Sequence, residues 1–216
     1  MKKWLARLWY KRTIGRLKNS RYKHLLLEVD SIKARRILEV GVYNGRNSKR
    51  MIRTAMMHHA SSRIEYFGFD IFDQVTLEVA EKEKTADKMP LPMEQVRLQL
   101  TSTGANIYLF QGCSHESIPN FSKTEHALIP MDFIFIDGGH SEETIMADWK
   151  NLQSVIGEKT VVVFDDYYQE SAQDGCRSLI SSLDPEEYCT TILEPSQIFQ
   201  KDTGPLVISF AKVTRV

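Results

Sequence analysis

The sequence predicts a doubly wound, Rossmann-like α/β fold with a mostly parallel seven-stranded sheet, and three observations support this prediction. Short apolar segments rich in β-formers alternate along the chain with segments of helical periodicity. Phe133–Ile136, a helical pattern beginning at Ser141 and Thr160–Phe164 together form one strand–helix–strand unit, which requires parallel strands. Thr190–Leu193 and Leu206–Val213 flank a tight turn at the end of the chain, so we expect an antiparallel hairpin there and an antiparallel last strand.

The other elements follow from the same periodicities. Ser141 is a suitable N-cap for the central helix, Glu142 and Glu143 suit the positive end of its dipole, and Gly157 is expected to end it. The turn after the third strand covers residues 111–114, and residues 73–104 form the least regular region. The further strands are predicted at Arg36–Val40, Ile64–Phe69 and Ile107–Phe110, and the further helices at residues 47–56, 75–84, 94–100 and 176–183.

Length and composition favour one globular domain. A chain of 216 residues with 42% hydrophobic and 26% charged residues can bury a core that is stable alone. The three cysteines, Cys113, Cys176 and Cys189, are odd in number and form no C-x-x-C pair. We therefore expect a cytoplasmic protein without a structural zinc site.

The zero net charge conceals an uneven distribution. Residues 1–27 contain nine Lys or Arg and no acid, so the remainder holds 19 basic against 28 acidic residues. We divide the chain into a basic N-terminal arm, residues 1–34, and a main domain, residues 35–216. The arm is predicted to be helical, with Trp4, Leu5, Leu8 and Trp9 on one side. It has three candidate partners: the sheet or a second subunit of a homo-oligomer, an anionic membrane at the inner surface, and a nucleic acid.

Polar residues follow several of the predicted strands at one sheet edge. Glu39, Gly41 and Gly45 surround the turn after the first strand, where glycines let a ligand approach the backbone. Asp70 ends the second strand, a position from which a carboxylate binds ribose hydroxyls in nucleotide-binding folds. A structural turn glycine and a solvated strand end are the alternatives for these positions.

Three carboxylates and a histidine are predicted to meet at the same edge. Asp137 and His140 follow the fourth strand, and Asp165 and Asp166 end the fifth. Gathering like charges is unfavourable unless a cation or a reacting proton requires them. Hard oxygen ligands suit Mg²⁺, so the sequence predicts a divalent metal at the three aspartates.

These segments together resemble the motifs of class I S-adenosylmethionine-dependent methyltransferases. The resemblance rests on ILEVGVYNGRNS, YFGFDIF, LFQGCSHESIP, DFIFIDGGHSEETIMADWKNL and VVVFDDYY, in that order, and spans about residues 35–213. Within that family the chain is most similar to the macrocin-type sugar O-methyltransferases. The resemblance implies a seven-stranded sheet whose last strand is antiparallel.

The resemblance also implies roles for single residues. Glu39, Gly41 and Gly45 would line the methionine half of S-adenosylmethionine, and Asp70 would bind its ribose. Asp137 could serve the metal or the cofactor's ammonium group, and His140 matches a proposed base. Further residues assigned by position are Gly112, Cys113 and Ser114 at the adenine, Asp165 and Asp166 at the metal, and Tyr43 at the cofactor, with substrate contact or packing as its alternatives.

The chain is thus predicted to be a metal-assisted O-methyltransferase acting on a sugar, glycan precursor or other small polyol. A metal-independent N- or macromolecule methyltransferase is the second hypothesis. The third is a non-catalytic cofactor-binding module attached through the basic arm. A nucleic-acid substrate is disfavoured because the chain lacks the Asn/Asp-Pro-Pro-Tyr/Phe motif that receives a flipped base.

Overall fold

The sheet has seven strands in the order β3-β2-β1-β4-β5-β7-β6. The computed structural model describes residues 3–83, 89–169, 175–201 and 204–216. The first five strands run parallel, β7 is antiparallel to β5, and β6 is antiparallel to β7. The strands are β1 (Arg36–Val40), β2 (Glu65–Asp70), β3 (Asn106–Gln111), β4 (Met131–Ile136), β5 (Ile156–Tyr168), β6 (Tyr188–Lys201) and β7 (Gly204–Arg215).

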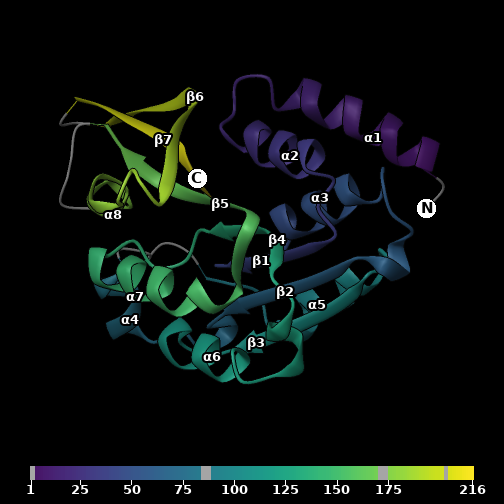
Figure 1. Ribbon diagram of the computed structural model, residues 1–216, viewed down its shortest axis with the longest axis horizontal. Coiled ribbons are helices and arrows are strands. Elements are labelled where there is room, and N and C mark those ends of the chain that lie inside the picture. The colour runs from purple at the N-terminus through teal and green to yellow at the C-terminus, as the bar shows by residue number, and fades with distance from the viewer. Residues whose placement is uncertain (1–2, 84–88, 170–174, 202–203) are drawn as a thin grey trace.

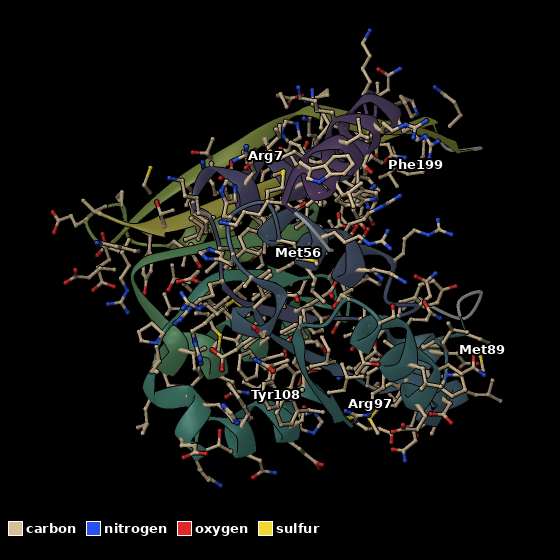
Figure 2. The ribbon with its side chains drawn as sticks, turned by 90° about the vertical axis from the view of Figure 1, so that its right-hand side faces the viewer. Arg7, Met56, Met89, Arg97, Tyr108 and Phe199 are labelled. Atoms are coloured by element: carbon tan, nitrogen blue, oxygen red, sulfur yellow. The ribbon has the colours of Figure 1, made fainter. Side chains whose placement is uncertain are left out.

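This topology confirms the predicted fold. The sheet order reverses between β1 and β4, which opens a crevice beyond their carboxyl ends. The predicted hairpin forms from β6 and β7, with Leu193 paired to Phe210, although residues 202 and 203 of its turn lie outside the described residues. Figure 2 shows Phe199 of β6 and Arg7 at one end of the molecule, and Tyr108 of β3 and Arg97 toward the other.

Helices cover both faces of the sheet. One face packs against α2, α3 and α5, which share a core with Ile37 and Phe133, and the other packs against α6, α7 and α8, which share a core with Leu38 and Ile134. Figure 1 shows α1, α2 and α3 together on one side and α6 and α7 on the other. The helices are α1 (Lys3–Arg16), α2 (Tyr22–Ser31), α3 (Arg46–Ala55), α4 (Leu77–Lys82), α5 (Met93–Thr101), α6 (Ser114–Phe121), α7 (Glu142–Leu152) and α8 (Arg177–Ser182).

One helix was missing from the prediction, and two predicted element ends were wrong. Residues 114–121 form a helix, α6, of which only Ser114 was assigned, to a turn, and Pro119 inside the helix obscures the helical pattern. The central helix α7 ends at Leu152 through a short 3-10 turn rather than at Gly157, which already belongs to β5. Strand β5 runs on through both predicted metal ligands, Asp165 and Asp166, to Tyr168.

The N-terminal segment packs on the rest of the protein. Leu25, Leu26 and Val29 of α2 are buried in the same core as β1 and β4, so α2 belongs to the packed body in spite of its position before residue 34. The expected apolar stripe of α1 does not make this contact, because Trp4 is 61% exposed and Leu8 50%. In the described part of the chain, no helix has the length and apolar character needed to cross a membrane.

Candidate functional site

A cavity of about 440 Å³ lies at the carboxyl ends of β1 to β4. The loops after these four strands form most of its wall, and Tyr22 at the start of α2 closes one side. Predicted site residues that line it are Gly41, Tyr43, Asp70, Gly112, Cys113, Ser114, Asp137 and His140. The sheet edge thus brings together residues that are far apart in the sequence, as expected where the strand order reverses.

Gly41 brings the loops after β1 and β4 into direct contact. Its φ is +89°, and a Cβ atom built on it would lie 1.9 Å from the backbone oxygen of Asp137. The Gly41 amide also donates to the Phe69 carbonyl at 2.9 Å, and the Asp137 amide donates to Val40 at 2.8 Å. Only glycine combines this backbone conformation with this close approach, so Gly41 fixes the floor of the cavity.

Asp70 organises the loops on the β2 side of the cavity. Its Oδ2 accepts a hydrogen bond from the Tyr43 amide at 2.7 Å, and its Oδ1 accepts one from the Phe72 amide at 2.6 Å. Burial raises the pKa of Asp70, while the amide hydrogen bonds oppose that shift. Each carboxylate oxygen has a second lone pair, so Asp70 can also accept from the hydroxyls of a ligand.

Glu39 and Gly45 do not line this cavity. Glu39 is 1% exposed and accepts hydrogen bonds from the hydroxyls of Ser48 and Tyr66. Its side chain shares the face of β1 that packs on α3, because alternate strand residues point to opposite faces. Burial raises the pKa of Glu39 to about 8, with the two hydrogen bonds opposing the shift. Glu39 was expected beside the methionine half of a cofactor, but its side chain is buried against Ser48 and Tyr66 and does not reach the cavity.

Asp165 forms a buried ion pair with Arg21. Its Oδ1 lies 2.7 Å from Arg21 Nε and its Oδ2 lies 2.9 Å from Arg21 Nη2, while Tyr22 donates to Oδ2 at 3.1 Å. The Asp166 amide donates to Oδ1 at 2.7 Å. Burial opposes the charge of Arg21, yet the neighbouring carboxylates raise its pKa above the usual value, so Arg21 is charged. Burial and Asp166 raise the pKa of Asp165, and the Arg21 charge opposes that shift. Asp165 is thus surrounded by four donors.

Asp166 and His140 form a second pair beside the first. Asp166 Oδ2 is hydrogen-bonded to His140 Nδ1, and Asp166 has a φ of +57°. The backbone holds both residues, because Gly175 donates to the His140 carbonyl at 3.2 Å and Cys176 donates to the Asp166 carbonyl at 3.2 Å. A carboxylate that accepts from Nδ1 favours the tautomer with its lone pair on Nε2. His140 therefore combines a place on the cavity wall with the orientation of a general base.

Asp137 lies in the cavity, close to both pairs. Burial raises its pKa well above the ordinary value, and the nearby charges of Asp165 and Asp166 raise it further. The mutual repulsion that the sequence predicts for the three carboxylates is therefore present here. Arg21 supplies the positive charge that partly offsets it.

The predicted Mg²⁺ ligands do not fit a divalent ion in this arrangement. A metal would need lone pairs of Asp165 that already accept from Arg21, Tyr22 and a backbone amide. Among the residues that the structure describes, no group of three or more His, Cys, Asp or Glu is arranged to hold a metal. The predicted metal site is corrected because Arg21 already provides a positive charge beside Asp165 and Asp166. Its position next to these aspartates is not visible in the sequence.

Sequence reasoning missed other residues of the site. Tyr22 lines the cavity although it belongs to the predicted arm. Glu83 accepts hydrogen bonds from the Ser141 amide at 3.0 Å and the Thr144 hydroxyl at 2.6 Å, and so ties the start of α7 to the cavity wall. A signal for Arg21 did exist, because the basic segment precedes a remainder of the chain that holds 28 acidic against 19 basic residues.

Comparison with known proteins identifies a family. A family model described as a methyltransferase domain matches residues 38–167. The fold resembles an O-methyltransferase from Bacillus cereus solved with SAH (16% identity, TM-score 0.60, covering 97% of this chain and 90% of that one). It also resembles the O-methyltransferase TomG from Streptomyces achromogenes, involved in tomaymycin synthesis and solved with SAM (16%, 0.58, 89% and 79%).

An rRNA methylase from Streptococcus thermophilus is similar as well (10% identity, TM-score 0.57, covering 90% of this chain and 95% of that one). Among curated proteins, no sequence gives a significant match. Structures with such different acceptors share this fold, so the likeness defines the architecture and leaves the acceptor to be argued from the site.

Proposed function

Because the chain belongs to the methyltransferase-domain family, we propose that it is an S-adenosylmethionine-dependent O-methyltransferase with a small-molecule acceptor. The observation that carries the proposal is the His140–Asp166 pair, since His140 lines the same cavity as Asp70 and the Gly41 turn. The wall that suits a nucleoside and the oriented base then face the same cavity. General base catalysis accelerates transfer to an oxygen that must lose its proton.

The cavity wall supports binding of the cofactor. Asp70 can accept from ribose hydroxyls, and the loop at Gly112, Cys113 and Ser114 offers a surface for a flat base. Gly41 lets the ligand approach the backbone above Asp137. When bound, S-adenosylmethionine supplies a methyl group on a positively charged sulfur, which an oxygen nucleophile can displace.

His140 performs the proton transfer in this proposal. Its imidazole takes the proton of the acceptor hydroxyl while the new C–O bond forms and the C–S bond breaks. Asp166 holds the ring and stabilises the imidazolium that results. The sulfur of a bound S-adenosylmethionine would keep the electron pair of the broken bond, and His140 would pass its proton to water.

The proposed reaction uses no divalent metal. Arg21 holds Asp165 through two hydrogen bonds and lies 3.9 Å from Asp166 Oδ1, so it provides positive charge where the ion was expected. The base in this scheme is His140, oriented by a carboxylate, and it needs no Lewis acid. The proposed enzyme is therefore metal-independent. It shares this feature with the second hypothesis from the sequence, but its acceptor atom is an oxygen of a small molecule.

The acceptor is proposed from chemistry alone. A sugar, glycan precursor or other polyol offers the hydroxyl that His140 would deprotonate, and membership of the macrocin-type branch belongs to this proposal. Polar groups near the cavity, among them Tyr43 and Asn44, suit hydroxyl-rich ligands. The cytoplasmic location, homo-oligomer formation and membrane contact through residues 1–27 stay predictions.

Two measurements test the proposed function. Calorimetry with S-adenosylhomocysteine should detect binding to the purified chain. Transfer of a labelled methyl group should then be measured for panels of nucleotide sugars, polyols, amines and RNA, with and without a chelator. We expect labelled ethers with sugars or polyols, at rates that the chelator leaves unchanged. Labelled amines or RNA alone would overturn the O-methyltransferase proposal, and loss of activity in chelator that Mg²⁺ restores would overturn its metal-independent form.

A further inference from the structure

A second cavity, of about 480 Å³, lies between α1 and α3, beside Gln99 of α5. Five positively charged side chains line it and no carboxylate does: Arg16, Arg46, Lys49, Arg50 and Arg53. Four of the five come from α3, whose other side carries Met51 and Ile52 into the core. The helix therefore presents an apolar side to the sheet and a cationic side to this cavity.

These cations have no acidic partners among the described residues. The ion pairs of the described chain join other residues, such as Arg21 with Asp165 and Arg36 with Glu65. Arg50 donates to the Asn47 side chain at 3.2 Å, which is a neutral partner. Partial burial and the nearby charge of Arg46 lower the pKa of Arg50. An anion in the cavity would relieve this repulsion.

The remaining walls favour an anion with oxygen atoms on several sides. Gly45 is the N-cap residue of α3, has a φ of +69° and lines the cavity, so the positive end of the helix dipole lies beside it. Asn44 Oδ1 accepts from the Arg46 amide at 3.0 Å, and the charged side chains of α3 are therefore the main anion donors. Trp9 packs under Arg53, with the guanidinium carbon 5.5 Å from the ring centroid, which orients that side chain. Oriented guanidinium groups bind phosphate through paired hydrogen bonds.

We propose that this second cavity is a phosphate-binding site that takes a phosphate or diphosphate group. Asn44 lines both cavities, so a group held here lies next to the loop that positions Tyr43 and Asp70. The phosphate can belong to a soluble compound or to a lipid headgroup. Exposed Trp4 and Leu8 on α1 make binding to a lipid headgroup possible. An apolar helix face can enter the membrane interface while the cations bind the headgroups.

Direct binding tests this proposal independently of methyl transfer. Inorganic pyrophosphate should be titrated into the full chain by calorimetry at low salt. Co-sedimentation should use vesicles of phosphatidylcholine alone and of equimolar phosphatidylcholine and phosphatidic acid. Wild-type protein should bind pyrophosphate, and the affinity should fall as salt rises. Sedimentation with the acidic vesicles, blocked by pyrophosphate, would assign the site to a lipid headgroup, whereas pyrophosphate binding without sedimentation would assign it to a soluble phosphate compound.

Two variants and a control make the result specific. R50Q/R53Q should weaken pyrophosphate binding by about tenfold or more, because it removes charge-assisted hydrogen bonds to the phosphate, which contribute more to affinity than neutral ones. R46Q/K49Q, which includes the exposed Arg46, should do the same without lowering the melting temperature. K123Q/K150Q removes two exposed charges after α6 and on α7, on the other face of the sheet, and should bind like wild type. Absence of pyrophosphate binding, or equal loss in all three variants, would overturn the proposal.

Discussion

Arg21 and Asp165, separated by 144 positions in the sequence, form a two-point ion pair in which Nε lies 2.7 Å from Oδ1 and Nη2 lies 2.9 Å from Oδ2. Arg21 is 7% exposed and Asp165 4%. The pair attaches the start of α2 to the end of the fifth strand and leaves Tyr22 on the cavity wall. The N-terminal segment is thereby part of the candidate active site.

Arg21→Met should therefore destabilise the protein. Removing one partner of a buried pair leaves an uncompensated charge, which costs about 3–5 kcal/mol in typical cases. Denaturant unfolding followed by circular dichroism measures this change. R21M/D165N should recover part of the loss because it removes both charges, and Arg12→Met on the exposed side of α1 should have little effect. Equal stability of Arg21→Met and wild type would show that the pair is not formed in solution.

Asp70→Asn should weaken the binding of S-adenosylhomocysteine. The amide group retains one acceptor oxygen, so the Tyr43 or Phe72 amide loses its partner, and unpaired polar groups cost about 1–3 kcal/mol each. Calorimetry gives the dissociation constant directly. Asp73→Asn, three residues further along in an exposed position, serves as the matched control. Unchanged affinity in Asp70→Asn would remove Asp70 from the cofactor site.

Gly41→Ala and Gly15→Ala should have opposite effects. At Gly41 the new Cβ would meet the Asp137 backbone oxygen at 1.9 Å, so the β1 and β4 loops must separate and cofactor binding should be lost. Gly15 lies in α1 with open space around it, and alanine there should stabilise by roughly 0.5–1 kcal/mol. Melting temperatures and calorimetry with S-adenosylhomocysteine compare the two. Cofactor binding by Gly41→Ala at wild-type affinity would contradict the close contact between the loops.

His140→Ala should reduce turnover by about 10²–10⁴-fold if His140 is the general base. The Asp70 and Gly112 sides of the cavity are untouched, so S-adenosylhomocysteine should still bind. Steady-state kinetics on an identified acceptor separates kcat from KM. His115→Ala changes another histidine of the same cavity wall and should leave kcat close to the wild-type value. A wild-type kcat for His140→Ala would exclude the proposed base.

Stability should fall as pH rises from about 4.5 toward about 8 because of Glu39. Burial raises the pKa of folded Glu39 to about 8, so the unfolded chain loses this proton at lower pH than the folded chain does. The stabilising contribution is complete below the ordinary value of 4.5 and is lost once the pH exceeds about 8. Asp148, whose pKa burial raises to about 7, acts in the same direction.

Glu39→Gln isolates the contribution of Glu39. Its amide oxygen can still accept from Ser48 and Tyr66, and it cannot ionise. Denaturant unfolding at about pH 5 and about pH 8 should show a smaller loss of stability for the variant than for wild type. Equal losses in both proteins would mean that folded Glu39 titrates near its ordinary pKa.

Local pattern was enough to identify most elements of the fold. The β-forming runs at Arg36–Val40 and Phe133–Ile136 are buried strands, and Ser141 accepts from the Thr144 amide as the N-cap of α7. These features depend on residues within a few positions of each other, so their physical causes are visible in the sequence. The order of the polar turns then indicated which loops would share the cavity.

Contacts between distant residues determined the chemistry of the site. The sequence places carboxylates at the ends of the fourth and fifth strands, but it does not reveal that α2 brings Arg21 to Asp165 or that Asp166 binds His140. It also suggests a cofactor role for Glu39, whereas strand alternation directs that side chain toward Ser48 on α3. The sequence by itself determined which segments form strands and which residues are available at the sheet edge. Only the tertiary structure decided which charges are neutralised there, because electrostatic pairing depends on distances in space that local periodicity does not specify.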